Sequence, residues 1–163
     1  MKTMAKVTLV ICCALFLASC SPPATGPINP GDKVGNFLVT TGDAKTIEES
    51  WAIDCPDAET AANYNCNARV GPKVNVSWGI YVTGWDDLDA AWAEHSDEIF
   101  INDRPVNLEA FGTQDAVHPH MGKMRYWNVV VLASAPGKLS VRNRGVDEGE
   151  PFDSTATFTF TAP

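Results

Sequence analysis

The sequence predicts an all-β fold, an antiparallel β-sandwich with one short helix, and three stretches carry this prediction. Apolar and polar residues alternate through Lys73–Thr83, and this period of two is typical of a half-buried strand. A second run, Arg125–Ser134, has a continuous apolar middle, which indicates a strand buried on both faces. The third, Ser154–Ala162, alternates Thr with apolar residues and places Phe158 and Phe160 on one face.

The other strands are shorter. Val34–Thr41 is expected to open the domain, and a short strand is expected around Trp51–Asp54. Two short strands flank a predicted hairpin turn at Asn102–Pro105. Ala135–Lys138 places Pro and Gly where a type II turn requires them, so the strand Lys138–Asn143 is expected to pair antiparallel with the strand before it.

One helix is expected after Gly84, with Asp86 as its N-terminal cap. Its apolar stripe has the helical spacing i, i+3, i+4, i+7 and consists of Leu88, Ala91, Trp92 and His95. The remainder forms about seven or eight strands with turn signals about every 8 to 12 residues, which favours a sandwich of immunoglobulin-like type. A small barrel is the competing architecture.

The N-terminus has the layout of an export signal. Lys2 and Lys6 precede an uncharged, largely apolar run, Val7–Ala18, that ends on small residues. This run of about 12 residues is shorter than the roughly 20 needed for a helix that crosses a bilayer. It therefore predicts a cleaved signal rather than a permanent membrane helix.

The end of that run, Leu17-Ala18-Ser19-Cys20, resembles the lipobox of bacterial lipoproteins. The resemblance implies a signal peptide over residues 1–19, a diacylglycerol on the sulfur of Cys20 and acylation of its new amino group. More than one acyl chain gives stable anchoring, whereas a single chain binds only marginally. The residue after Cys20 is Ser21 rather than Asp, and in this position the chain resembles lipoproteins that are not retained at an inner membrane. The expected location is extracytoplasmic, with the lipid in the bacterial cell membrane or outer membrane; an ordinary signal peptide with a chance cysteine is the alternative.

The cysteine count is consistent with export. Of five cysteines, Cys12 and Cys13 leave with the signal and Cys20 takes lipid, so Cys55 and Cys66 remain. An even remainder in an oxidising compartment predicts a disulfide. Two free thiols or a zinc site are the alternatives, although no further Cys or His pair stands at zinc-ligand spacing.

The mature chain is expected to contain a tether and one domain. Residues 20–32 are rich in Pro and Gly and predict a semi-rigid spacer, and residues 33–163 suit one β-sandwich domain. Removal of residues 1–19 leaves 10 basic and 20 acidic residues, a formal net charge near −10. Such a surface repels phosphate backbones, so nucleic acid is not an expected partner.

One loop offers soft metal ligands. His118 and His120 stand two residues apart, Met121 and Met124 follow, and Asp115 precedes them. Imidazole and thioether ligands suit copper, and an exported protein encounters such metals. The same residues are also compatible with a solvated surface loop shaped by its proline.

Five tryptophans offer a second kind of site, since aromatic rings lie flat against sugars in many carbohydrate-binding sandwiches. Trp78 and Trp92 fall on the apolar faces of their expected strand and helix, so both are assigned to the core. Trp85 and Trp51 remain as candidates to face a glycan or a partner protein.

Catalysis has little support. The sequence contains no nucleophile elbow, metalloprotease helix motif or phosphate-binding loop, and no spacing selects a catalytic triad. His95 is expected in a core or boundary position. The preferred prediction is a non-enzymatic binding or interaction module without a cofactor, whose partner is an envelope protein or glycan. An extracytoplasmic copper-type metal-binding protein and a structural envelope lipoprotein are the alternatives.

Overall fold

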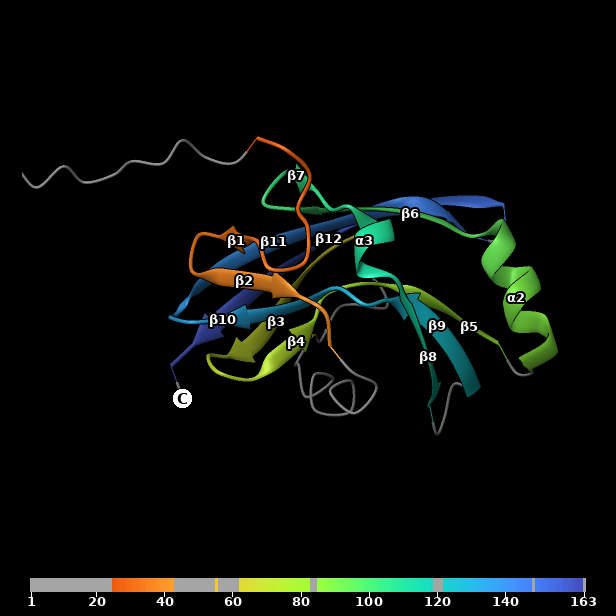
Figure 1. Cartoon of the computed structure of the whole chain (residues 1–163), viewed down its shortest axis with the longest axis horizontal. Coiled ribbons are helices and arrows are strands. Elements are labelled where there is room, and N and C mark those ends of the chain that lie inside the picture. The colour runs from red at the N-terminus through yellow and green to blue at the C-terminus, as the bar shows by residue number, and fades with distance from the viewer. Residues whose placement is uncertain are drawn as a thin grey trace, which may run out of the picture.

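A computed structural model describes residues 25–42, 55, 62–82, 85–118, 122–147 and 149–162. Strands dominate these residues and form three sheets, and two helices lie in the connections between strands, so the all-β sandwich prediction is confirmed (Figure 1). The described part holds twelve strands and two helices rather than seven or eight strands and one helix, because several expected strands are divided.

The first sheet has four strands in the order β1-β2-β10-β4, all paired antiparallel. Its members are β1 (Lys33–Val34), β2 (Phe37–Thr40), β10 (Val130–Ala133) and β4 (Lys73–Asn75). The expected opening strand Val34–Thr41 is thus a small hairpin, since Gly35 has φ +61° and turns the chain after β1.

The second sheet has five strands in the order β3-β12-β11-β6-β7. They are β3 (Asn63–Arg69), β12 (Glu150–Thr161), β11 (Gly137–Asp147), β6 (Ser96–Ile101) and β7 (Arg104–Pro105). Its pairs are antiparallel except that β3 runs parallel to β12. The expectation of a wholly antiparallel sandwich is therefore wrong at this one pair.

The third sheet has three antiparallel strands in the order β5-β9-β8. They are β5 (Gly79–Val82), β9 (Gly122–Trp127) and β8 (Thr113–His118). Helix α2 (Trp85–Glu94) contacts β5 and β9, and a single helical turn, α3 (Leu108–Phe111), precedes β8. Figure 1 shows this sheet and α2 at the end of the molecule opposite β1.

The core lies between the four-stranded and five-stranded sheets. Phe37 of the first packs against Phe160 of the second with ring centroids 5.1 Å apart. Alternate residues of β12 are buried, and they include Phe158 and Phe160 as the sequence predicted. Cys66 of β3 is fully buried in the same cluster and forms a disulfide with Cys55, which confirms that pairing.

Two expected long strands change sheet partway along. Lys73–Thr83 is divided into β4 and β5 and passes from the four-stranded to the three-stranded sheet. Arg125–Ser134 is divided into β9 and β10 and passes from the three-stranded to the four-stranded sheet. At the first bend, the Ser77 N–H donates to Asn75 Oδ1 at 2.7 Å, a local bond that competes with the strand ladder. This side-chain bond explains why the alternation in Lys73–Thr83 does not give one straight strand.

The turn Ala135–Lys138 does not form the expected hairpin. The strand that follows, β11, pairs with β12 and β6 and makes no pair with β10. The Ser134 N–H and hydroxyl donate to the Asn36 carbonyl at 3.0 and 2.9 Å, which holds this turn against the β1–β2 hairpin. The turn therefore connects the two layers of the sandwich.

The other local predictions fare better. The hairpin at Asn102–Pro105 is present, with Asn102 and Asp103 both at positive φ as a two-residue type I′ turn requires. The second of the two expected short strands is reduced to β7, and α3 follows it. Helix α2 forms, begins one residue before Asp86, and buries Leu88 as its stripe predicts.

The packed domain begins before Asp32, within the stretch where the sequence predicted a spacer. Ile28 is fully buried in the main core cluster. Its N–H donates to the Pro105 carbonyl at 2.8 Å, and its carbonyl accepts from the Asn107 N–H at 2.9 Å. The boundary at residues 32 and 33 is corrected accordingly, since residues from Ile28 onward belong to the packed domain.

Candidate functional site

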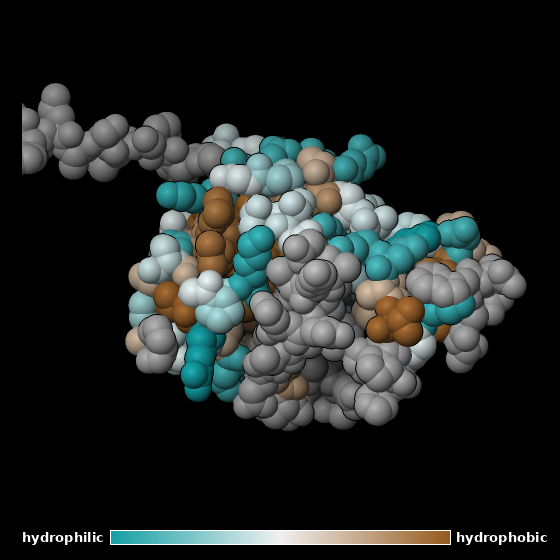
Figure 2. Space-filling view, turned by 60° about the horizontal axis from the view of Figure 1, so that its bottom comes forward, coloured by the Kyte–Doolittle hydropathy of each residue, from teal (hydrophilic) through white to brown (hydrophobic). Residues whose placement is uncertain are grey.

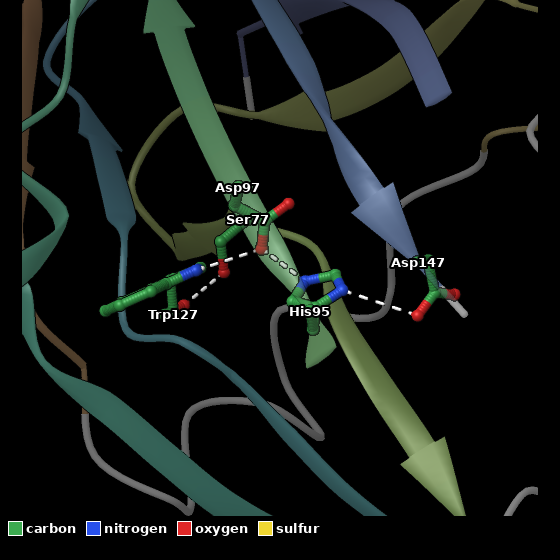
Figure 3. A network of polar contacts seen from close by, with 5 residues as sticks. All are labelled: Ser77, His95, Asp97, Trp127 and Asp147. Atoms are coloured by element: carbon green, nitrogen blue, oxygen red, sulfur yellow. Dashed lines mark hydrogen bonds and ion pairs between the residues drawn. The ribbon is translucent and has the colours of Figure 1, made fainter. Parts of the chain in front are cut away.

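His95 lies in a buried cluster, in contact with two carboxylates and two aromatic rings. It lies between the end of α2 and the start of β6, and its own N–H bonds the Trp92 carbonyl at 3.3 Å. The inward position that the helical spacing predicts for His95 is confirmed, because only 4% of its side chain is exposed. Figure 3 shows the imidazole with one carboxylate at each ring nitrogen.

Asp97 is the inner carboxylate of this cluster, and its side chain is fully buried. Its Oδ2 lies 2.6 Å from His95 Nε2 and accepts a second bond, 2.9 Å long, from the indole Nε1 of Trp127. A buried charge is tolerated only when such partners replace water. Asp97 therefore ties β6 to β9 and fixes one side of the imidazole.

Asp147 is the outer carboxylate, at the end of β11, and about half of its side chain is exposed (Figure 3). Its Oδ1 lies 3.4 Å from His95 Nδ1, an ion-pair distance that is longer than a normal hydrogen bond. The imidazole is held on its faces by two rings. Phe152 is nearly parallel to it with centroids 6.1 Å apart, and Trp92 lies at 5.2 Å.

These surroundings favour the charged ring. Burial by itself lowers the pKa of His95, but the hydrogen bond and charge of Asp97, with a further contribution from Asp147, outweigh it. The pKa of His95 is thus raised above its ordinary value. The position at the C-terminal end of α2, where a helix favours positive charge, acts in the same direction.

The cluster is not arranged as a catalytic triad. Ser77, the nearest hydroxyl, donates to the carbonyl of Trp127 rather than to His95 (Figure 3). Because His95 and Asp97 are both buried, a substrate has no direct contact with the base. Among the described residues, this network can hold a proton and fasten strands together, but it presents no activated nucleophile.

A second feature is the outer face of the five-stranded sheet. The inward residues of β3 and β12 belong to the core, so Asn63, Asn65 and Asn67 of β3 and Thr155, Thr157 and Thr159 of β12 project outward. We call these six residues, with Ser140 of β11, the polar face. Within the described part of the chain, none of these seven side chains forms a hydrogen bond.

The polar face is regular because the parallel register aligns its two main strands. Asn63, Asn65 and Asn67 pair with Thr155, Thr157 and Thr159, and Ser140 pairs with Thr157 from the other side. Neighbouring side chains are therefore about 4.8 Å apart across strands and about 6.8 Å apart along them. The surface offers amide and hydroxyl groups, which both donate and accept hydrogen bonds, at fixed intervals.

Charged residues border the polar face and are mostly paired. Arg142 forms a two-bond contact with Asp153, and Arg144 pairs with Glu98 while its guanidinium lies 4.9 Å from the Phe100 ring centroid. The guanidinium of Arg142 holds the pKa of Asp153 below its usual range. These charges are balanced by each other and leave the centre of the face uncharged.

The predicted metal ligands are not brought together in the part of the loop that the structure describes. Asp115 is engaged by Arg125 at 2.7 and 2.8 Å, and this contact lowers the pKa of Asp115. Met124 is buried on the opposite face of the β8–β9 hairpin, since it pairs with Ala116 while Asp115 pairs with Arg125. His118 ends β8. His120 and Met121 lie outside the described residues.

Across its described residues, the structure groups no three His, Cys, Asp or Glu side chains as a metal site. The copper alternative therefore gains no support from Asp115 and Met124, which face different sides of the hairpin.

The predicted ligand-facing tryptophans are only partly placed. Trp85 is the first residue of α2, and Trp51 lies outside the described residues. The assignment of Trp78 to the core is wrong, because 38% of it is exposed beside the bend that divides the long strand. It packs edge-on against Tyr64 of β3, with centroids 6.1 Å apart. Trp92 does pack inward, against Trp127 at 5.3 Å.

The lipobox, including Cys20, lies outside the described residues. In the part that is described, neither helix is long and apolar enough to cross a membrane.

The sequence analysis did not identify the polar face or the two carboxylates of the His95 cluster. The polar face has a signal, because Asn63–Arg69 alternates Asn with Tyr, Cys and Ala, a period of two that indicates a strand. Asp97 stands two residues from His95. Asp147 has no local signal, since its contact depends on the pairing of β11 with β6.

No protein-family model, curated protein or solved structure matches this chain. The function is therefore argued from its own residues.

Proposed function

We propose that this protein is a lipid-anchored, extracytoplasmic binding module of the bacterial cell envelope, and that the polar face is its contact surface. The lipobox at Leu17–Cys20 supports the anchor, and the Cys55–Cys66 disulfide fits an oxidising compartment. The spacer before Ile28 keeps the domain a short distance from the lipid. The unpaired amide and hydroxyl array on the five-stranded sheet carries the binding part of the proposal.

The chemistry of the polar face favours an uncharged, hydroxyl-rich polymer, which in a cell envelope is a glycan. Protein interfaces are centred on aromatic, Met or Arg side chains that fill apolar pockets, and the polar face has none at its centre. Sugar hydroxyls both donate and accept, as do Thr hydroxyls and Asn amides. A glycan strand lying over β3 and β12 therefore has a matching partner for each of its groups.

The apolar surface does not offer a better contact site. On the part of the surface that Figure 2 colours, brown side chains form separate small groups among teal and white ones. The large exposed apolar side chains are scattered, and Tyr81 and Val117 project from opposite faces of the three-stranded sheet. A contact surface for protein usually requires a continuous apolar patch.

The anchor is tested by mass spectrometry of the N-terminal fragment of the exported protein. The expected product begins at Cys20 and carries a diacylglycerol on sulfur with an acylated amine. Cys20→Ser is expected to prevent lipid attachment and to release the protein from the membrane fraction. A mature N-terminus elsewhere, or an unmodified Cys20, would contradict the anchor and leave the binding proposal to its own test.

The binding surface is tested by calorimetry of the mature lipoprotein in detergent with uncharged oligosaccharides, including N-acetylglucosamine oligomers, dextran and mannan fragments. The double variant Thr155→Val, Thr157→Val keeps the shape of each side chain and removes two hydroxyls. At about 0.5–1.5 kcal/mol per hydrogen bond, the loss of two bonds is expected to weaken binding about 5- to 150-fold. Thr113→Val, on exposed β8, is the matched control. Unchanged affinity in the double variant would contradict the polar face as the contact surface.

A further inference from the structure

We propose that His95 is a pH-sensitive latch, which holds the tip of the β11–β12 hairpin against the junction of α2 and β6 when its ring is protonated and releases the tip when the ring is neutral. This device goes beyond the binding function, because it acts within the fold and does not depend on what the polar face binds. The tip consists of Val146 and Asp147 on β11 and Glu150 and Pro151 on β12.

The carboxylates at the two ring nitrogens favour a ring that is protonated on both sides. Asp97 Oδ2 lies 2.6 Å from Nε2, and Asp147 Oδ1 lies 3.4 Å from Nδ1. An imidazolium has an N–H on each side, whereas a neutral imidazole has one N–H and one lone pair. A neutral ring therefore turns a lone pair toward one of the two carboxylates, and that contact becomes repulsive.

The Asp147 side is the one that opens. Asp97 is fully buried, lies closer to the ring and also accepts a bond from Trp127, so the remaining proton stays on Nε2. Asp147 is about half exposed and belongs to a hairpin tip that turns at Gly149, whose φ is +82°. Its carboxylate can move into water without leaving a buried charge behind.

The imidazole of His95 itself stays in place, because two aromatic rings pack against it. Phe152 lies nearly parallel to the imidazole, and Trp92 contacts the imidazole from α2. The last turn of α2 contains no basic side chain. On β9, Arg125 lies 5.9 Å from the centroid of the Trp92 ring and is engaged by Asp89 and Asp115. Within the described part of the chain, the charged groups in contact with His95 are therefore the carboxylates of Asp97 and Asp147.

The direction of the switch follows from these charges. The native pKa of His95 is raised above the ordinary value of 6.5. Its stabilising effect is fully present below about pH 6.5, the value expected in the unfolded chain, and is lost as the pH rises through the native pKa. The latch is closed in acid and opens as the pH rises through the raised native pKa of His95.

NMR of the mature lipoprotein in detergent tests the latch between about pH 5.5 and 9. Both ring nitrogens of His95 are expected to be protonated at low pH, with a midpoint above 6.5. Exchange protection of the hairpin-tip amides, corrected for intrinsic rates, is expected to fall about two- to fivefold through the same midpoint, since the contact involves a half-exposed carboxylate. The core amide of Val141 is the internal reference and should not respond.

Asp147→Asn tests the outer carboxylate without disturbing the core. We expect a lower His95 midpoint and low tip protection at every pH. Glu150→Gln, opposite Asp147 in the same hairpin, is the matched control and should keep the pH response. A wild-type midpoint at or below 6.5, tip protection that does not change with pH, or a full pH response in Asp147→Asn would each overturn the latch.

Discussion

Asp97→Asn is the substitution that tests the buried cluster most sharply. Asp97 makes two charge-assisted contacts, with His95 Nε2 at 2.6 Å and Trp127 Nε1 at 2.9 Å, and its side chain has no exposure. Asparagine keeps the shape but removes the charge. Because a charge-assisted bond stabilises by about 1 kcal/mol more than a neutral one, two weakened bonds cost about 2 kcal/mol.

The full cost is larger when His95 loses its buried counter-ion, since breaking such a pair costs about 3–5 kcal/mol. We therefore expect Asp97→Asn to lower the free energy of unfolding by about 2–4 kcal/mol. Urea titration followed by tryptophan fluorescence measures this difference. The loss should be greater at about pH 5.5 than at about pH 9, because Asp97 stabilises the protonated form of His95.

Asp153→Asn is the matched control. Asp153 accepts hydrogen bonds from Arg142, but its side chain is about half exposed, so solvent screens the contact and a smaller loss of stability than that of Asp97→Asn is expected. The reasoning about the buried cluster would be refuted if Asp97→Asn cost no more than Asp153→Asn, or if its effect were the same at both pH values.

Three further predictions concern the backbone, the disulfide and wild-type stability. Gly145→Ala is expected to lower the free energy of unfolding, measured by thermal unfolding, by about 3 kcal/mol. The reason is that a Cβ at this position overlaps the Ser96 carbonyl and lies 2.9 Å from the Phe152 ring. An unchanged stability would show that β6 and β11 are spaced differently. Reduction of the Cys55–Cys66 disulfide is expected to lower the free energy of unfolding, measured by urea titration, by up to about 3 kcal/mol. An unchanged free energy of unfolding after reduction would contradict a stabilising role of the disulfide. Wild-type stability is expected to decline as the pH rises above about 6.5, and a flat profile up to about pH 9 would contradict the charged state assigned to His95.

Local patterns predicted what depends on neighbours in sequence. The inward faces of β12 and α2 follow from periods of two and 3.6, and the hairpin at Asn102 and Asp103 follows from its turn residues. The same alternation failed at residues 75–78, because the Asn75 side chain bonds the Ser77 backbone and bends the strand out of one sheet.

Contacts between distant segments were beyond such patterns. The polar face depends on the parallel pairing of β3 with β12, whose residues are about ninety positions apart, and no local rule selects that partner. The His95 cluster depends on the register of β11 against β6, which brings Asp147 to the end of α2. The helical spacing predicted that His95 is buried, but it did not predict that the carboxylates of Asp97 and Asp147 contact its ring.

Amide chemical-shift mapping of the protein in detergent with the tightest-binding oligosaccharide tests the proposed contact surface most directly. Shifts are expected in Asn63, Asn65 and Asn67 of β3 and in Thr155, Thr157 and Thr159 of β12, with none in the exposed hairpin β8–β9. Shifts confined to the β8–β9 hairpin or to the surroundings of Trp78, with β3 and β12 unaffected, would contradict the polar face as the binding site.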